Sequence, residues 1–154
     1  MADASYWLYD HGRHRTAFAA AAEPGTASDL SGLGGHEYAV LVTFRRDGTA
    51  VPTPVWFALL DDRRFVTATE ERTAKVRRIR RNPRVRVFPS DPRGKPLGAG
   101  VEGTVRILEA AEERAAAEAA LDRHYGRKRR IYERVMTDPS DTVYLEVTVA
   151  GAAG

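Results

Sequence analysis

Cysteine is absent from the 154-residue chain, which excludes a disulfide framework and thiolate metal sites. Long apolar runs are missing as well. The alanine tract Ala19–Ala22 is far too short for a signal-peptide core or a membrane span, and no basic region precedes an apolar run near the N-terminus. We therefore expect a soluble, cytoplasmic protein that makes no contact with a membrane.

Lysine is scarce, and arginine supplies almost all of the positive charge. The chain has three lysines among 24 basic residues, and its formal net charge is only +3. Seven basic residues nevertheless fall between Lys75 and Arg86. A lysine inside an arginine-rich stretch draws attention, because a compact ammonium and a planar guanidinium bind anions differently. We expect this stretch to lie close to an anion.

Neither a metal centre nor a catalytic constellation is recognisable. His11 and His14 have a spacing that could fit a metal, but no third ligand accompanies them, so we interpret them as surface histidines and expect no metal. No serine, histidine and acid stand in a familiar arrangement, and the catalytic residues are unknown. If the protein is an enzyme, a bound cofactor is expected to carry the chemistry.

The order of the predicted elements indicates a mainly β (α+β) fold. Strands are expected at 38–45, 50–60, 64–68, 84–89, 98–108 and 141–150, with helices around 15–22, 74–82, 109–125 and 127–136. Asp47 and Gly48 form a strong hairpin signal between the first two strands. Antiparallel succession with few helices predicts a small, partly open β-barrel with helices packed on it. We expect an N-terminal extension of unclear structure over 1–35, the barrel domain over 36–150 and a tail over 151–154.

Two prolines mark the second strand as unusual. Pro52 and Pro54 have no N–H to donate, so a central strand would not tolerate them. This strand should therefore lie at an edge or be bulged there. Its free backbone groups would be able to bind a ligand.

The segment Thr69–Pro83 predicts a strand end followed by a short basic helix, with Thr73 as N-cap and Pro83 as the stop. On a helical wheel Lys75 falls roughly 40° from Ile79, so it should lean back over the sheet. Three interpretations of the basic charge remain open. They are a solvated face, a nucleic-acid surface, and a phosphate site built from Thr69, Thr73, the helix start and Lys75. The nucleic-acid interpretation is the least favoured, because no aromatic platform accompanies the arginines.

A GxGxxG pattern occurs at Gly98, Gly100 and Gly103. A dinucleotide fingerprint requires a helix that opens inside the pattern, whereas the residues after Gly103 alternate like a strand. We therefore expect these glycines to let a strand bend or pass close to another backbone.

Three segments together resemble a known family. YAVLVTFRRDGTAVPTPVWFAL, TATEERTAKVRRIRRNPRVRV and DPRGKPLGAGVEGTVRIL are similar, in order and spacing, to the deazaflavin-dependent branch of the pyridoxamine 5′-phosphate oxidase-like proteins. The resemblance runs from about Tyr38 to Leu108 and weakly to the end. It implies a six-stranded antiparallel split β-barrel of the FMN-binding type and a homodimer with two cofactors bound across its interface.

The resemblance also implies a set of cofactor-binding residues. Lys75 would contact the cofactor phosphate beside Thr73 and the Ala74 backbone, and Arg78 would be a second phosphate or tail contact. The remaining contacts, along the ring system and the end of the third strand, would come from Thr53, Pro54, Val55, Trp56, Thr67 and Thr69. The cofactor implied is coenzyme F420, with FMN as the alternative. The surplus arginines around 77–84 would suit the polyglutamate tail of F420, although plain solvation explains them too.

The function implied is an F420-dependent oxidoreductase that transfers a hydride from the reduced deazaflavin to an unsaturated small-molecule acceptor. The basic and histidine-containing motifs with which the oxidase proper binds pyridoxal phosphate are missing, so vitamin B6 oxidation is not expected. Two alternatives remain: an FMN-dependent oxidoreductase on the same fold, and a protein that binds a flavin or deazaflavin without turnover. The physiological substrate cannot be read from the sequence.

Overall fold

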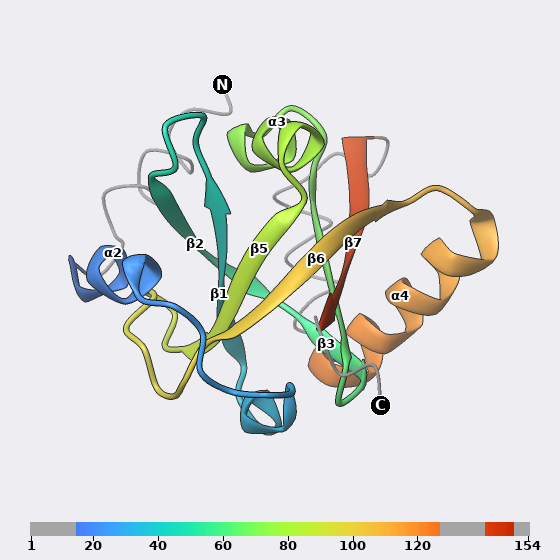
Figure 1. The fold of residues 1–154 in the computed structure, drawn as a ribbon. Coiled ribbons are helices and arrows are strands. Elements are labelled where there is room, and N and C mark those ends of the chain that lie inside the picture. The colour runs from blue at the N-terminus through green and yellow to red at the C-terminus, as the bar shows by residue number, and fades with distance from the viewer. Residues whose placement is uncertain (1–14, 127–140, 150–154) are drawn as a thin grey trace.

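The computed structural model describes residues 15–126 and 141–149, which form one seven-stranded sheet with helices around it (Figure 1). The strands are β1 (Tyr38–Phe44), β2 (Ala50–Trp56), β3 (Ala58–Asp61), β4 (Arg64–Glu70), β5 (Arg84–Ser90), β6 (Val101–Leu108) and β7 (Thr142–Val149). The helices are α2 (Arg15–Ala22), the 3-10 helix η1 (Ser31–Leu33), α3 (Ala74–Arg81) and α4 (Ala111–Tyr125). His11, His14, the helix expected at 127–136 and the tail 151–154 lie outside the described residues.

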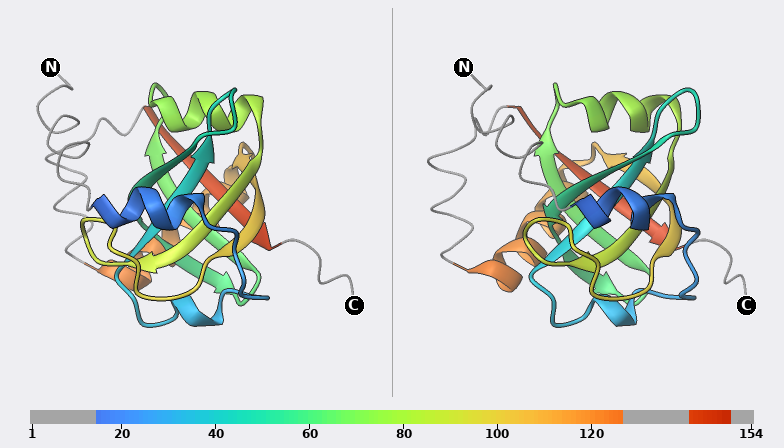
Figure 2. Two further views of the ribbon diagram at one scale, coloured as in Figure 1. Left: turned by 60° about the vertical axis from the view of Figure 1, so that its left-hand side comes forward. Right: turned by 90° about the vertical axis from the view of Figure 1, so that its left-hand side faces the viewer.

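The sheet is antiparallel throughout and has the order β2-β1-β5-β6-β7-β4-β3. Its two end strands, β2 and β3, follow each other directly in the chain, so the sheet curls round into a barrel that stays open between them (Figure 2). The predicted mainly β, barrel-like fold is confirmed. No helix in the described part of the chain is both long and apolar enough to span a membrane.

The predicted number of six strands is wrong, because the return strand expected at 50–60 is divided at Phe57. The β1–β2 ladder ends at the pair Tyr38 and Trp56, and the β3–β4 ladder begins at Ala58 and Val66. Phe57 lies between the two ladders, and its N–H donates to the Tyr125 hydroxyl at 2.7 Å. Phe57 belongs to neither ladder, so one expected strand becomes two.

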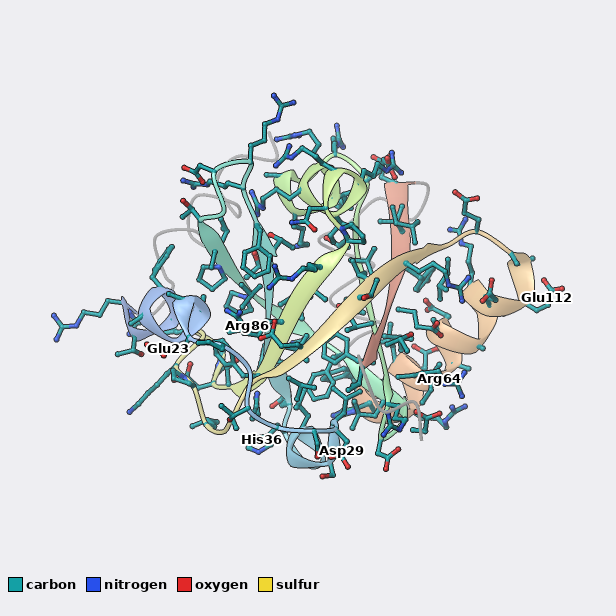
Figure 3. All side chains as sticks on the ribbon, viewed as in Figure 1. Glu23, Asp29, His36, Arg64, Arg86 and Glu112 are labelled. Carbon is teal, nitrogen blue, oxygen red and sulfur yellow. The ribbon has the colours of Figure 1, made fainter. Side chains whose placement is uncertain are left out.

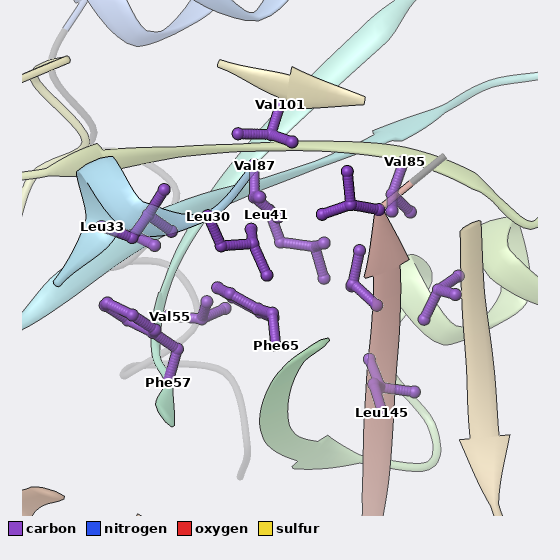
Figure 4. Packing of buried hydrophobic residues seen from close by; sticks show 14 of the residues in the cluster. Leu30, Leu33, Leu41, Val55, Phe57, Phe65, Val85, Val87, Val101 and Leu145 are labelled. Carbon is purple, nitrogen blue, oxygen red and sulfur yellow. The ribbon is translucent and has the colours of Figure 1, made fainter. Parts of the chain in front are cut away.

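Buried side chains from strands all around the barrel fill its interior, as Figure 4 shows. Phe57 and Phe65 are fully buried, and their rings stack with centroids 5.1 Å apart. Leu30 and Leu33 come from the segment before β1 and are also buried in this core. Part of the segment for which the sequence predicted no clear structure therefore helps to fill the barrel.

Helices cover the barrel on three sides. The expected helix at Arg15–Ala22 is confirmed as α2, which packs through Ala17 and Ala21 on the outer face (Figure 2). On another face α4 packs Leu121 and neighbouring alanines against Val66 of β4. α3 lies across one end of the barrel with Ile79 in the core (Figure 1).

The glycine pattern has the structural role that its context predicted. Gly103 lies within β6, and a Cβ atom there would meet Val147 Cγ1 at 2.7 Å and the Thr148 carbonyl oxygen at 2.8 Å. Only glycine permits so close an approach of β7. A helix does not follow, so this pattern is no dinucleotide fingerprint.

An ion pair ties the chain after α2 to the sheet. The guanidinium of Arg86, labelled in Figure 3, donates to Glu102 and to the Ala21 carbonyl, and the Gly25 N–H donates to Glu102 Oε2 at 2.6 Å. Arg86 is 6% exposed. Burial acts to raise the pKa of Glu102, but its bonds to Arg86 and Gly25 outweigh burial and hold that pKa below its ordinary value of 4.5.

We predict that Glu102→Gln lowers the free energy of unfolding by about 1–3 kcal/mol at neutral pH, because Arg86 loses its counter-charge while buried. A carboxylate with a lowered pKa stabilises the fold above its ordinary pKa, and this contribution disappears as the pH falls through the folded value. Urea unfolding at neutral and acidic pH should therefore show the difference between wild type and variant shrinking towards low pH.

The matched control is Glu71→Gln, which removes the exposed ion pair with Arg80 (side chains 43% and 53% exposed). An exposed pair of this kind contributes at most about 1 kcal/mol. Equal losses in the two variants would contradict a stabilising role for the buried pair.

Candidate functional site

The turn from β4 into α3 is built by Thr73. Thr73 is the N-cap residue, as the sequence predicts, but its hydroxyl donates back to the Glu70 carbonyl at 2.9 Å. Its own N–H donates to the same carbonyl at 3.2 Å. The side chain of Thr73 therefore makes no capping bond to the first N–H groups of α3. An uncapped helix start is a suitable place for an anion, because N–H groups and the helix dipole both point to it.

The basic side chains of α3 divide between the sheet and the solvent, as the helical wheel predicts. Lys75 and Arg78 are half-buried, whereas Arg77, Arg80 and Arg81 are exposed. Arg78 Nε donates to the hydroxyl of Thr43 at 2.6 Å, and Thr43 is completely buried in β1. Arg78 thus joins α3 to β1 at the end of the barrel, which is a structural role in addition to the predicted contact with a cofactor.

Two of the predicted threonines share one face of β4. Thr67 is completely buried, and its hydroxyl donates to the Trp56 carbonyl at 2.6 Å. This bond connects β4 to the end of β2. Thr69 is half-buried two residues further on, on the same face and closer to the start of α3. Ala74, the first residue of α3, is exposed.

The predicted edge position of the proline-containing strand is confirmed. β2 is the terminal strand of the sheet, with Pro52 opposite Val42 and Pro54 opposite Val40. The predicted residues on it point to two faces. Val55 packs in the barrel core, whereas Pro54 lies on the outer face, where its Cγ would be 3.4 Å from a Cβ added at Gly94.

Thr53 is half-buried on the same face as Val55. Because neighbouring residues of β2 face opposite sides, one ligand cannot contact all their side chains. A ring bound along this strand would therefore have to use its backbone groups.

Trp56 lies in an aromatic cluster that the sequence did not reveal. Its indole stacks on Tyr125 with centroids 4.8 Å apart and planes 16° apart, and Tyr38 meets it edge-on at 6.4 Å. Trp56 remains half-buried. In the sequence, Tyr125 follows Leu121 by four residues on an alanine-rich helix, and this spacing is the one signal that the two side chains share a face.

The ten predicted residues are therefore only partly brought together. Trp56 and Thr67 are in direct contact, Thr69 and Thr73 with Lys75 flank the turn into α3, and Arg78 extends from α3 to β1. Two surface depressions of about 560 and 280 Å³ lie elsewhere, one between α3, β6 and the start of α4, the other between the end of α2 and the loop before β6. The described residues contain no cluster of histidine and acidic side chains that could hold a metal.

Residues 30–153 match the sequence profile described as pyridoxamine 5′-phosphate oxidase. The chain belongs to the pyridoxamine 5′-phosphate oxidase family. A comparison with curated proteins finds no match.

Solved structures share the fold of this family member. An F420 reductase is 24% identical and has a TM-score of 0.52, over 82% of this chain and 96% of its own. A FAD-binding protein from Mesorhizobium loti is 18% identical with a TM-score of 0.55, over 78% and 84% of the two chains. A heme-binding protein from Mycobacterium smegmatis is 20% identical with a TM-score of 0.59, over 82% and 52%. Proteins of one fold thus bind chemically different ligands.

We predict that Thr67→Val lowers the free energy of unfolding by about 0.5–1.5 kcal/mol, because it keeps the shape of the side chain but removes the bond to the Trp56 carbonyl. Urea unfolding with both mutants measures this loss. The control is Thr148→Val at an exposed position of β7, where the stability should be unchanged. A Thr67→Val protein as stable as the control would show that this bond does not hold β4 to β2.

Proposed function

We propose that this protein is an oxidoreductase that uses reduced coenzyme F420 to reduce an unsaturated or conjugated small-molecule acceptor. The observation that carries the proposal is the uncapped start of α3, which lies beside Thr69 and Lys75 at the end of β4. Membership of the family and the fold shared with an F420 reductase support it. The bound cofactor would supply the hydride, and the chain would supply binding and orientation.

The phosphate of the cofactor would lie at the start of α3. Lys75 provides a compact positive charge there, and the backbone N–H of Ala74 and the hydroxyl of Thr73 are the hydrogen-bonding groups next to it. The hydroxyl of Thr73 donates to the Glu70 carbonyl, so it would have to accept a bond or rotate. The exposed Arg77 and Arg81 would extend the positive charge towards an acidic tail.

The ring system would lie along the outer edge of β2, with Thr53 to Trp56 beside it. β2 is the end strand of the sheet, and its peptide groups would hold the polar edge of the ring. Water has to be kept from the reacting face, and the aromatic surface of Trp56 would contribute to this.

We further propose that two copies of the chain complete each site as a homodimer. Support comes from the location of the predicted residues, which lie on the edge strand β2, on β4 and in the first half of α3. None of them lines either of the two depressions. A partner surface would convert this open edge into an enclosed site.

FMN is the second candidate cofactor, and the shared fold with a FAD-binding protein favours it. A paired titration with F420 and FMN, followed by tryptophan fluorescence, distinguishes the two. We expect tight binding of F420 alone, with quenching of Trp56, and then oxidation of reduced F420 by at least one member of a panel of quinones, enones and linear tetrapyrroles. Preference for FMN would replace the cofactor, and binding without turnover on any acceptor would leave a carrier protein.

We predict that Lys75→Ala weakens F420 binding by about 1–3 kcal/mol, the range for a lost hydrogen bond to a charged group. Isothermal titration calorimetry measures the change. Lys95→Ala is the control, an exposed lysine in the loop between β5 and β6, where the affinity should be nearly unchanged. Equal losses would indicate a general electrostatic effect, and unchanged affinity in Lys75→Ala would place the phosphate elsewhere.

A further inference from the structure

The hydroxyl of Tyr125 replaces the backbone contact of one residue pair in the β1–β2 ladder. Tyr38 pairs with Trp56, so the next pair in this register is Glu37 with Phe57. These two residues are connected through the tyrosine: Phe57 N–H donates to the hydroxyl at 2.7 Å, and the hydroxyl donates to the Glu37 carbonyl at 2.5 Å. A side chain thus satisfies the two backbone groups at the point where the strands part.

The same tyrosine fixes the plane of Trp56. Its ring stacks on the indole at 4.8 Å with planes 16° apart, and the carbonyl of Trp56 is held separately by Thr67. Tyr125 itself is only 9% exposed. It is the last residue of α4, and Leu121 on that helix is buried against the sheet, so the position of the ring is set by a packed helix.

We propose that Tyr125 is a positioning residue for the cofactor ring. It separates β2 from β1 at Phe57 through its hydroxyl, and it holds the indole of Trp56 in a fixed plane through its ring. This inference rests on the proposed function, because it assigns Trp56 to the site where the ring binds. Its two physical parts, the residue pair bridged by the hydroxyl and the stacked rings, belong to the protein without ligand.

Two substitutions separate the roles of hydroxyl and ring. Tyr125→Phe keeps the stacking surface but removes both hydrogen bonds, which leaves the Phe57 N–H without its acceptor. Tyr125→Leu removes the stacking as well. The matched control is Tyr144→Phe, which keeps its ring but removes a hydroxyl that bonds to Glu118 of the same helix α4.

The ligand-free measurements are made first. In a Trp7→Phe background Trp56 is the single tryptophan, so acrylamide quenching reports its accessibility and hydrogen exchange by NMR reports the Phe57 amide. We predict that Tyr125→Phe speeds exchange of the Phe57 amide about tenfold, the effect of one lost hydrogen bond, with little change in quenching. Tyr125→Leu should additionally increase quenching about twofold. Tyr144→Phe should change neither value.

The cofactor titration is the second measurement. Tyr125→Phe and Tyr125→Leu should weaken F420 binding, the leucine variant by about tenfold, whereas Tyr144→Phe should bind as the wild type does. Unchanged exchange and quenching in both Tyr125 variants would overturn the inference. So would altered exchange and quenching with unaltered F420 affinity, since Tyr125 would then serve only the fold.

The measurements would give a different result if the proposed function were wrong. If the wild type bound neither F420 nor FMN, the role of Tyr125 towards a cofactor ring would fall with the proposed function. The exchange and quenching data would still decide whether Tyr125 holds Trp56 and parts the strands. A leucine variant that did not fold would leave the phenylalanine variant, which retains the ring, to give the answer.

Discussion

The backbone of Phe57 lies in neither the β1–β2 nor the β3–β4 ladder, and much of the structure depends on how its polar groups find partners. The chain runs along β1 as β2, crosses at Phe57 and continues along β4 as β3. A buried N–H without a partner at the crossing would cost about 1–3 kcal/mol. The Tyr125 hydroxyl supplies that partner, while the Phe57 side chain fills the barrel core beside Phe65. Phe57 thus packs its side chain in the barrel interior and marks the point where the chain leaves β1.

The basic run from Lys75 to Arg86 looks uniform in sequence, but the structure assigns its members to different tasks. Arg86 is buried against Glu102, Arg78 reaches the buried Thr43, and Arg84 lies 5.3 Å from the Phe44 ring centroid. These are contacts within the fold and not with an external anion. Part of the positive charge in this run therefore stabilises the fold itself.

Patterns that depend on neighbouring residues were predictable from the sequence. Asp47 and Gly48 form the expected turn, with Gly48 at φ +88°, and Thr73 and Pro83 bracket α3. The edge position of β2 followed from its two prolines. The bonds of Tyr125 to Phe57 and of Arg86 to Glu102 could not be predicted, because each joins residues brought together only by the complete fold. For the same reason the burial of Leu30 and Leu33 was not foreseen.

The candidate site was predictable to a smaller extent, because a shared fold does not select a ligand. Proteins with this barrel bind F420, FAD or heme, so the choice has to come from groups specific to the ligand. Coenzyme F420 and FMN carry a phosphate, whereas heme needs a protein ligand to its iron. Of the histidines in the described residues, His36 lies at the opposite end of the barrel from α3 (Figure 3), and His124 packs beside Phe57. The uncapped helix start with Lys75 is the observation on which the proposal of a phosphate-bearing cofactor rests. For this reason F420 or FMN, and not heme, is the cofactor that we propose.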